Sequence, residues 1–348
     1  AFANNTQTIS IEEVSEYATI WNNATKKMIL VGVNEPNAIS KKTITAFAKE
    51  ESVVVLTETT SNVHHETFIN TIDTIITPFT KEDFEYFRPE ILVTFGGMVV
   101  SKRIKTFLRK YKPKHHWHID SWRAYDTFGA LTKHFEVTPN VFFDAFLPLT
   151  NATESNYFQQ LNAVKVLRKL KSDFYLSKIP FSDFKVFEKV IQRLPMNSQL
   201  QISNSSAIRY AQLIDIDPSI DVYCNRGTSG IDGSTSTAIG AAVANKKQTI
   251  FITGDISFLY DSNALWNNYI PKNFKIILIN NGGGGIFRIL PGHEESPVFN
   301  TFFETSHCLT AEHLAKMYGF EYGIASDETS LVTSLNALYA QNEKPSIL

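Results

Sequence analysis

The chain has 348 residues, of which 43% are hydrophobic, and its 33 basic and 35 acidic side chains give a formal net charge of −2. This length suggests two domains, each long enough to bury a core. The balanced charge argues against a nucleic-acid partner, and no apolar run reaches the roughly 18 residues of a membrane-spanning helix, so we expect no membrane insertion. The two cysteines, Cys224 and Cys308, cannot form a disulfide framework, which favours a cytoplasmic location.

In the first half of the chain, short apolar runs alternate with amphipathic segments. We predict strands over residues 28–32, 52–56, 91–96 and 116–120, and helices over residues 43–50 and 101–111. The strands are continuously rather than alternately hydrophobic, which is typical of a parallel sheet covered on both faces. Strands that alternate with helices indicate βαβ units.

The second half repeats this alternation after a loop at residues 147–153. We therefore place a boundary near residue 150, between domains 1–150 and 151–348. A helix is predicted over residues 154–170, followed by strands over 199–203, 222–224, 249–253 and 274–279 and a helix over 207–213. The predicted fold is α/β, with two doubly wound, mainly parallel-sheet domains.

Both ends of the chain resemble the edges of a fragment. The first residues, Ala-Phe-Ala-Asn-Asn, include no Met and no signal-peptide pattern, and residues 344–348 read as the beginning of a strand. We therefore expect that an N-terminal portion and a short C-terminal piece are missing.

Polar and glycine residues follow four predicted strands of the second domain. These segments are residues 204–205, 225–227, 254–255 and 280–283, and ten of the 16 glycines lie between Gly227 and Gly292. Ligands of open α/β sheets bind outside the carboxyl ends of the strands. The convergence of the four segments therefore predicts a ligand site at this edge of the second sheet.

Asp255 and Asn281 provide the oxygen donors of a possible cation site. Asp255 follows a strand at a probable helix start, where free N–H groups suit a phosphate, although a simple N-cap is the more ordinary interpretation of an isolated Asp there. Asn281 follows the next strand, and residues 282–285 are four contiguous glycines that allow close approach of backbone groups. Carboxylate, amide and carbonyl oxygens are the ligands that Mg²⁺ prefers. The glycines lack the GxGxxG spacing of a dinucleotide-binding loop.

The pair Gly254-Asp255 and Asn280-Asn281 resembles the motif of thiamin-diphosphate enzymes. By this resemblance, Asp255, Asn281 and the carbonyl of Gly283 would bind Mg²⁺ or Mn²⁺, which grips the diphosphate. The residue after Gly-Asp is usually glycine in that motif, whereas this chain has Ile256. The cofactor-binding residues implied in this way are Asn204, Gly254, Asp255, Ile256, Ser257, Asn281 and Gly283.

A second segment, residues 225–241, closely resembles one branch of these enzymes. The branch is the family of SEPHCHC (2-succinyl-5-enolpyruvyl-6-hydroxy-3-cyclohexene-1-carboxylate) synthases, which act in menaquinone biosynthesis; residues 204–209, 254–261 and 285–291 also fit it, and residues 101–103 fit more weakly. The resemblance implies decarboxylation of 2-oxoglutarate and conjugate addition of the resulting succinyl-semialdehyde carbanion to isochorismate, by a homodimer or homotetramer. It also implies that the family's pyrimidine-binding domain, with its activating glutamate, lies outside this chain. We therefore expect the chain alone to be inactive.

The same resemblance implies which residues bind the substrates. Both substrates carry carboxylates, which the planar guanidinium of arginine binds bidentately. Ser205, Arg209 and Arg226 would bind substrate in the second domain, and Lys102 and Arg103 would reach in from the first. For Lys102 and Arg103, a solvated helix start is an equally ordinary interpretation.

Apolar residues complete the implied catalytic set. Ile231 would be the wedge beneath the cofactor that forces its bent conformation. Ile286 and Phe287 would form a wall beside the reacting carbon, where an apolar surface disfavours the charged carboxylate and so favours loss of CO₂. The implied catalytic residues are Ile231, Arg226, Ile286 and Phe287.

Three other interpretations remain open. One is another thiamin-diphosphate 2-oxo-acid decarboxylase or an acetolactate-synthase-like enzyme, although those relatives usually keep glycine after Gly-Asp. A nucleotide-binding oxidoreductase could use the loops at Gly32 or at Gly96 and Gly97, but no GxGxxG is present. A non-catalytic scaffold would not need both Asp255 and Asn281.

Overall fold

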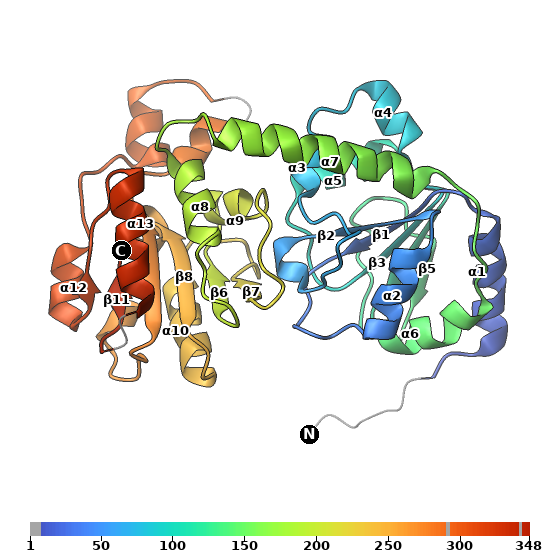
Figure 1. The fold of residues 1–348 in the computed structure, drawn as a ribbon, viewed down its shortest axis with the longest axis horizontal. Helices are drawn as coiled ribbons and strands as arrows, with labels where there is room; N and C mark the ends of the chain where they lie inside the picture. The colour runs from blue at the N-terminus through green and yellow to red at the C-terminus, as the bar shows by residue number, and fades with distance from the viewer. Residues whose placement is uncertain (1–7, 290–292, 341–342) are drawn as a thin grey trace. The chain divides into compact units, whose positions relative to one another are not determined.

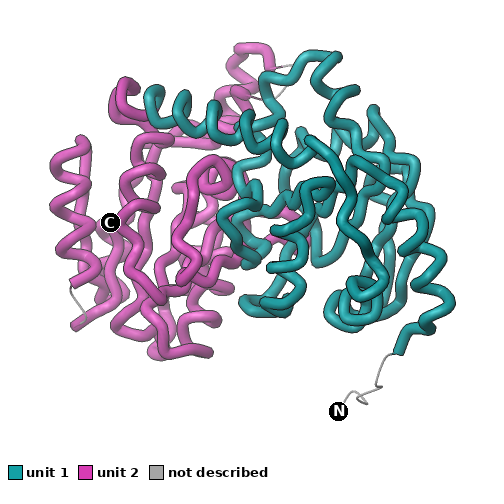
Figure 2. The backbone as a smooth tube through the Cα atoms, turned by 45° about the vertical axis from the view of Figure 1, so that its right-hand side comes forward, with its two compact units in different colours: residues 1–175 teal, residues 176–348 magenta. Residues whose placement is uncertain are grey.

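A computed structural model describes residues 8–289, 293–340 and 343–348. The chain divides into two compact units, residues Ala1–Tyr175 and Leu176–Leu348, drawn in different colours in Figure 2. Each unit is built around one parallel sheet with helices, as Figure 1 shows. The predicted α/β class with two parallel-sheet domains is confirmed.

Unit 1 contains a five-stranded parallel sheet in the order β2-β1-β3-β4-β5. Its strands are β1 (Lys27–Val31), β2 (Val53–Thr57), β3 (Ile91–Phe95), β4 (His115–Ile119) and β5 (Lys133–Phe135). Its α-helices are α1 (Ile11–Asn23), α2 (Lys41–Lys49), α3 (Ile72–Ile76), α4 (Lys81–Tyr86), α5 (Lys102–Lys110), α6 (Pro139–Phe146) and α7 (Tyr157–Leu176), with 3-10 turns η1 (Thr59–Ser61) and η2 (Leu147–Leu149).

Both faces of this sheet are covered by helices, which explains the uninterrupted hydrophobic strands. Successive side chains of a strand point to opposite faces. In β1, Ile29 and Val31 pack with α1, α2 and α6, whereas Met28 and Leu30 pack with α3, α5 and the start of α7. All five residues of β1 are buried; the continuous apolar pattern predicted this for residues 28–31 but not for Lys27.

The division between the units lies beyond the boundary that we predicted near residue 150. The predicted loop at 147–153 begins with the turn η2, and α7 starts at Tyr157. Tyr157 is fully buried, its hydroxyl donates to the carbonyl of Phe87 at 2.9 Å, and Leu161 lies in the same core. The first turns of α7 therefore belong to unit 1, because their apolar side chains complete its core.

A buried carboxyl group, Glu58, joins the end of β2 to the start of α5. Its side chain is 4% exposed and accepts the N–H groups of Val100 and Ser101, both at 2.6 Å. Burial raises the pKa of Glu58 to about 7, although the two N–H groups act in the opposite direction.

This shift predicts a specific pH dependence of stability. Because the folded pKa of Glu58 exceeds the unfolded value of 4.5, its contribution is fully present below pH 4.5 and is lost as pH rises through about 7. The free energy of unfolding should fall over this window by up to roughly 3 kcal/mol relative to Glu58→Gln. Urea unfolding of both proteins at several pH values measures the difference, and parallel stability curves would contradict the prediction.

Unit 2 contains a six-stranded parallel sheet in the order β10-β11-β9-β8-β6-β7. Its strands are β6 (Gln199–Ile202), β7 (Asp221–Cys224), β8 (Thr249–Gly254), β9 (Phe274–Ile279), β10 (Glu321–Tyr322) and β11 (Ser346–Ile347). Its α-helices are α8 (Asp183–Ile191), α9 (Ser206–Ala211), α10 (Ser234–Ala244), α11 (Asp255–Tyr260), α12 (Glu312–Tyr318) and α13 (Glu328–Ala340). Shorter turns are η3 (Ser262–Trp266), η4 (Gly285–Ile289) and the π-helical turn η5 (Phe299–Glu304).

The strand order places the predicted polar segments side by side. Strands β7, β6, β8 and β9 are neighbours in the sheet, and each is followed by one of the four segments predicted to form a ligand site. The last described residues insert as β11 between β9 and β10, where the N–H of Leu348 donates to Ile276 at 2.9 Å. Within the described parts of the chain, no helix combines the length and apolar character needed to cross a bilayer.

Candidate functional site

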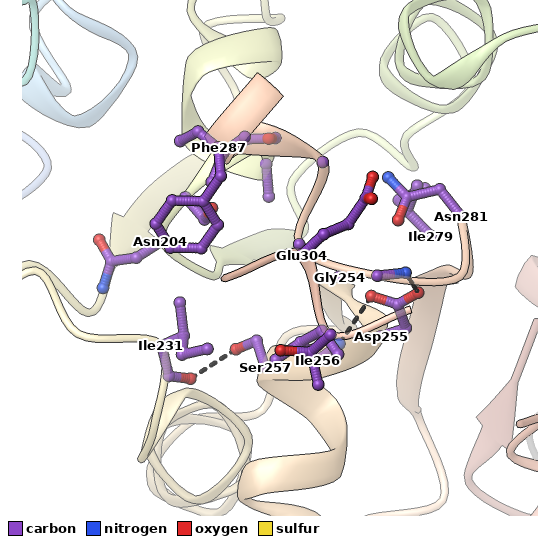
Figure 3. A pocket seen from close by; sticks show the side chains of 18 of the residues that line it. Asn204, Ile231, Gly254, Asp255, Ile256, Ser257, Ile279, Asn281, Phe287 and Glu304 are labelled. Atoms are coloured by element: carbon purple, nitrogen blue, oxygen red, sulfur yellow. Dashed lines mark hydrogen bonds between the residues drawn. The ribbon is translucent and has the colours of Figure 1, made fainter. Parts of the chain in front are cut away.

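A cavity of about 340 Å³ lies in unit 2 at the carboxyl ends of β6, β8 and β9. Figure 3 shows Asp255 and Asn281 on one side of it and Ile231, Asn204 and Phe287 on the other. The structure brings together most of the site residues predicted for this unit. Those that line the cavity are Asn204, Ser205, Ile231, Gly254, Asp255, Ile256, Ser257, Asn281, Gly283, Ile286 and Phe287.

Asp255 is the buried anionic group of this cavity. It begins α11 and is 4% exposed. Its Oδ2 accepts the N–H groups of Gly282 at 2.7 Å and Gly283 at 3.0 Å, and its Oδ1 accepts the N–H of Ile256 at 2.7 Å. These three bonds fix the carboxylate and tie β8 to the glycine-rich loop after β9.

The other two predicted metal ligands lie on that loop. The Asn281 amide nitrogen donates to Asp183 Oδ2 at 2.7 Å, so the amide oxygen is the atom of this side chain that could bind a cation. The Gly283 carbonyl accepts the N–H of Gly285 at 3.0 Å. A side chain added at Gly254 would meet no atom within 4 Å, so the backbone beside Asp255 borders open space. The oxygen donors suit a hard divalent cation, and the open space beside the Gly254 backbone suits a phosphate bound to that cation.

On the opposite side, Ile231, Ile286 and Phe287 form an apolar surface, and one of the hydrogen bonds that hold it involves Ile231. The Ser257 hydroxyl donates to the carbonyl of Ile231 at 2.6 Å, a contact drawn in Figure 3. This bond joins the first turn of α11 to the segment that precedes α10. Ile286 and Phe287 belong to the turn η4, and Phe287 is 37% exposed. The wall therefore presents side chains from two segments far apart in sequence.

Ser205 has an unusual backbone conformation, with φ of +70° and ψ of −129°. A non-glycine residue rarely adopts a positive φ, at a typical cost of about 1–3 kcal/mol, and such residues cluster at functional sites. The guanidinium of Arg209 donates to the Ser205 carbonyl at 2.6 Å. Arg209 therefore stabilises this conformation from α9, but it does not line the cavity.

Asn204 connects the segments that follow β6 and β7. It is 2% exposed, and its amide nitrogen donates to the carbonyls of Gly230, at 2.6 Å, and Asn225. Its amide oxygen accepts Arg226 Nη1 at 3.2 Å. Arg226 is half-buried against Asn204 and, like Arg209, does not line the cavity. Burial raises the pKa of the neighbouring Cys224 thiol to about 12, so this thiol stays protonated.

Lys102 and Arg103 lie in unit 1, on the first turn of α5, and both are exposed. They line a separate cavity of about 400 Å³ in unit 1, together with residues that include Lys81, Phe84 and Phe107. Within unit 1 their surroundings are thus basic and aromatic.

Several lining residues were not predicted. They come from α8, α9, α11 and the turn η5, and of them only Tyr260 lies in a segment that the sequence analysis singled out: Asp183, Tyr210, Tyr260, Phe302, Phe303 and Glu304. The carboxylate of Glu304 is paired with Arg288, which lies in the segment 285–291 that we had singled out. Leu290 and Pro291 of that segment lie outside the described residues.

The chain matches two models of the same protein family. The model described as the middle domain of thiamine pyrophosphate enzymes matches residues 4–202, and the C-terminal TPP-binding domain model matches residues 205–348.

Named relatives match almost the whole chain. It is 67% identical to a protein of Flavobacterium johnsoniae over 343 residues, which cover 98% of this chain and 62% of that protein. It is 64% identical to a protein of Flavobacterium psychrophilum, covering 99% and 62%, and 51% identical to one of Christiangramia forsetii, covering 97% and 60%. All three are named 2-succinyl-5-enolpyruvyl-6-hydroxy-3-cyclohexene-1-carboxylate synthase. The chain thus spans about three fifths of the length of these relatives.

Proposed function

The chain belongs to the thiamine pyrophosphate (thiamin diphosphate) enzymes, and from that premise we propose that it forms the central and diphosphate-binding parts of a SEPHCHC synthase. The proposed reaction is the decarboxylation of 2-oxoglutarate and the conjugate addition of the resulting four-carbon unit to isochorismate. Its relatives' names support this choice. So does one cavity that combines Asp255, Asn281 and Gly283 with the apolar wall of Ile231 and Phe287.

In this proposal the polar side of the cavity holds the diphosphate end of the cofactor through Mg²⁺ or Mn²⁺. Asp255, the Asn281 amide oxygen and the Gly283 carbonyl would be the protein ligands. The cofactor, when bound, supplies the nucleophilic carbon and the electron sink for decarboxylation. The further cofactor contacts would come from Asn204, Gly254, Ile256 and Ser257.

The apolar side would favour the chemical step. Ile231, held by Ser257, would support the bent cofactor, and Ile286 and Phe287 would exclude water from the carboxylate that is lost. Ser205, Arg209 and Arg226 would bind substrate carboxylates or hydroxyls, and Lys102 and Arg103 would add positive charge from unit 1. Arg209 and Arg226 would have to exchange the contacts with Ser205 and Asn204 for contacts with substrate.

The function is tested by assaying the full-length protein with thiamin diphosphate, Mg²⁺, 2-oxoglutarate and isochorismate. Mass spectrometry should detect SEPHCHC and the release of one CO₂ per product. Condensation of pyruvate instead of 2-oxoglutarate would indicate an acetolactate-synthase-like enzyme. Simple decarboxylation without addition would indicate a 2-oxo-acid decarboxylase.

Arg226→Ala should impair this reaction selectively. Charge-assisted hydrogen bonds contribute about 1.5–3 kcal/mol, so kcat/KM should fall by roughly ten- to a hundredfold for the substrate whose carboxylate Arg226 binds. Steady-state kinetics with each substrate varied in turn identify which KM rises. Arg193→Ala, at an arginine of unit 2 that does not line the cavity, is the matched control. Equal kinetics for Arg226→Ala and wild type would remove Arg226 from the substrate site.

We also propose that the full-length protein acts as a homodimer or homotetramer in the cytoplasm. Sedimentation of the full-length protein and fractionation of cells that express it test these two points.

A further inference from the structure

A histidine that no motif marks, His307, lies directly behind the proposed metal ligand Asp255. Its Nε2 atom is 3.3 Å from Asp255 Oδ2, and the two side chains are 12% and 5% exposed. His307 is not among the residues that line the cavity, whereas Asp255 is. The imidazole therefore reaches the Asp255 carboxylate without itself lining the cavity.

The other ring nitrogen indicates where the proton of a neutral imidazole lies. The backbone N–H of Leu309 donates to His307 Nδ1 at 3.1 Å, so Nδ1 presents its lone pair. In a neutral imidazole the hydrogen is then on Nε2, which faces Asp255. The Nε2 atom is buried and forms no hydrogen bond of good geometry with any described residue. The carboxylate beside it is that of Asp255.

The backbone around His307 also supports the glycine-rich loop. The N–H of His307 donates to the carbonyl of Gly282 at 3.0 Å, and the N–H of Gly284 donates to the carbonyl of Glu304 at 2.5 Å. A side chain added at Gly283 would stand 2.8 Å from that Glu304 carbonyl oxygen. The segment from Glu304 to His307 therefore packs against the same loop that carries Asn281 and Gly283.

We propose that His307 is a positioning residue that orients Asp255 for the divalent cation through an Nε2–H hydrogen bond to Oδ2. Groups that hydrogen-bond to a metal ligand fix its orientation, and their loss typically lowers metal affinity by about ten- to a hundredfold. Oδ2 bound by His307 and by the amides of Gly282 and Gly283 would leave Oδ1, which accepts the N–H of Ile256, as the oxygen turned to the metal. This inference rests on the proposed function, because it assumes that Asp255 binds a cation.

Two substitutions separate this role from a merely structural one. His307→Gln places an amide N–H near the position of Nε2 and loses the acceptor for Leu309, whereas His307→Asn keeps an acceptor near Nδ1 and loses the donor to Asp255. We expect His307→Asn to weaken Mn²⁺ binding to the full-length protein with thiamin diphosphate by about tenfold or more, and His307→Gln to retain most of the affinity. The loss of the free Mn²⁺ signal in electron paramagnetic resonance measures binding without turnover.

Three controls make the outcome decisive. His313→Ala, at an exposed histidine on α12, should bind Mn²⁺ as wild type does. If wild type and Asp255→Ala bind Mn²⁺ equally, the proposed function fails. The positioning role of His307 is overturned if Asp255→Ala loses Mn²⁺ binding while His307→Asn keeps the wild-type affinity. It is also overturned if His307→Gln binds Mn²⁺ more weakly than His307→Asn does. Thermal unfolding without metal establishes that the variants compared are folded.

Discussion

Replacing Asp255 by alanine is expected to lower the Mg²⁺-dependent affinity for thiamin diphosphate by at least about a hundredfold. The substitution removes the proposed anionic metal ligand itself, and loss of an outer contact alone already costs up to about a hundredfold. It also leaves the N–H groups of Gly282 and Gly283 without their acceptor, which loosens the loop that carries Asn281. Calorimetric titration of thiamin diphosphate with Mg²⁺ into both proteins measures the change.

Asp255→Asn and Asp261→Asn separate metal binding from folding. Asp255→Asn keeps the shape of the side chain and one acceptor, so its loss of affinity would reflect charge and ligation. Asp261 is also a buried carboxylate of unit 2, 6% exposed, and its Oδ2 accepts the N–H of Ser236 at 2.7 Å. It does not line the cavity, so Asp261→Asn should change stability rather than affinity. Equal titration curves for wild type and Asp255→Ala would remove the metal assignment.

Replacing Gly32 by alanine is expected to destabilise unit 1 by about 3 kcal/mol or more, the upper end of the usual cost of overpacking. The added Cβ would stand 1.9 Å from the carbonyl oxygen of Gly97. Both backbone segments are fixed, since Gly32 N–H donates to Phe95 at 2.8 Å and Gly97 N–H donates to Val33 at 2.7 Å. Urea unfolding should show a lower midpoint.

Gly240→Ala is the matched control for the added methyl group. Gly240 lies within α10, and a Cβ there meets no atom within 4 Å. Alanine in a helix interior is about 0.5–1 kcal/mol more favourable than glycine, so this variant should be slightly more stable. If Gly32→Ala has the same urea midpoint as wild type, the loops after β1 and β3 can separate without a loss of stability, and the prediction is wrong.

The sequence predicted most strands of both sheets, although not the short strands β5 and β10, and it predicted the edge of unit 2 that carries the cavity. Strands buried on both faces give short apolar runs, and β8 and β9 contain such runs before a polar or glycine segment, whereas β6 alternates Gln with apolar residues. Asp255 and Asn281 could be placed at this edge because they follow strands directly, where the carboxyl edge of a parallel sheet gathers such residues, whereas Gly283 was named only through the family resemblance. The predicted strand over 274–279 coincides with β9.

The side-chain contacts within the site could not be predicted in this way. Nothing near His307 in sequence indicates that it contacts Asp255, because the contact depends on how the turn η5 packs against the loop after β9. Arg226 is next to Asn225 in a recognisable segment, yet its guanidinium is held by Asn204, which follows another strand, β6. Hydrophobic periodicity reports burial, and it contains no information on which polar partner a buried group finds.

The insertion of β11 between β9 and β10 affects the order in which unit 2 can fold. Until residues 346–348 arrive, β9 has an unpaired edge, although it leads directly into the loop with Asn281. The pairing of β9 with β11 closes a long loop that includes α12, β10 and α13, and such non-local contacts form slowly because the loop entropy is lost first. The proposed cation site should therefore form late in refolding, after the sheet around β8 has formed.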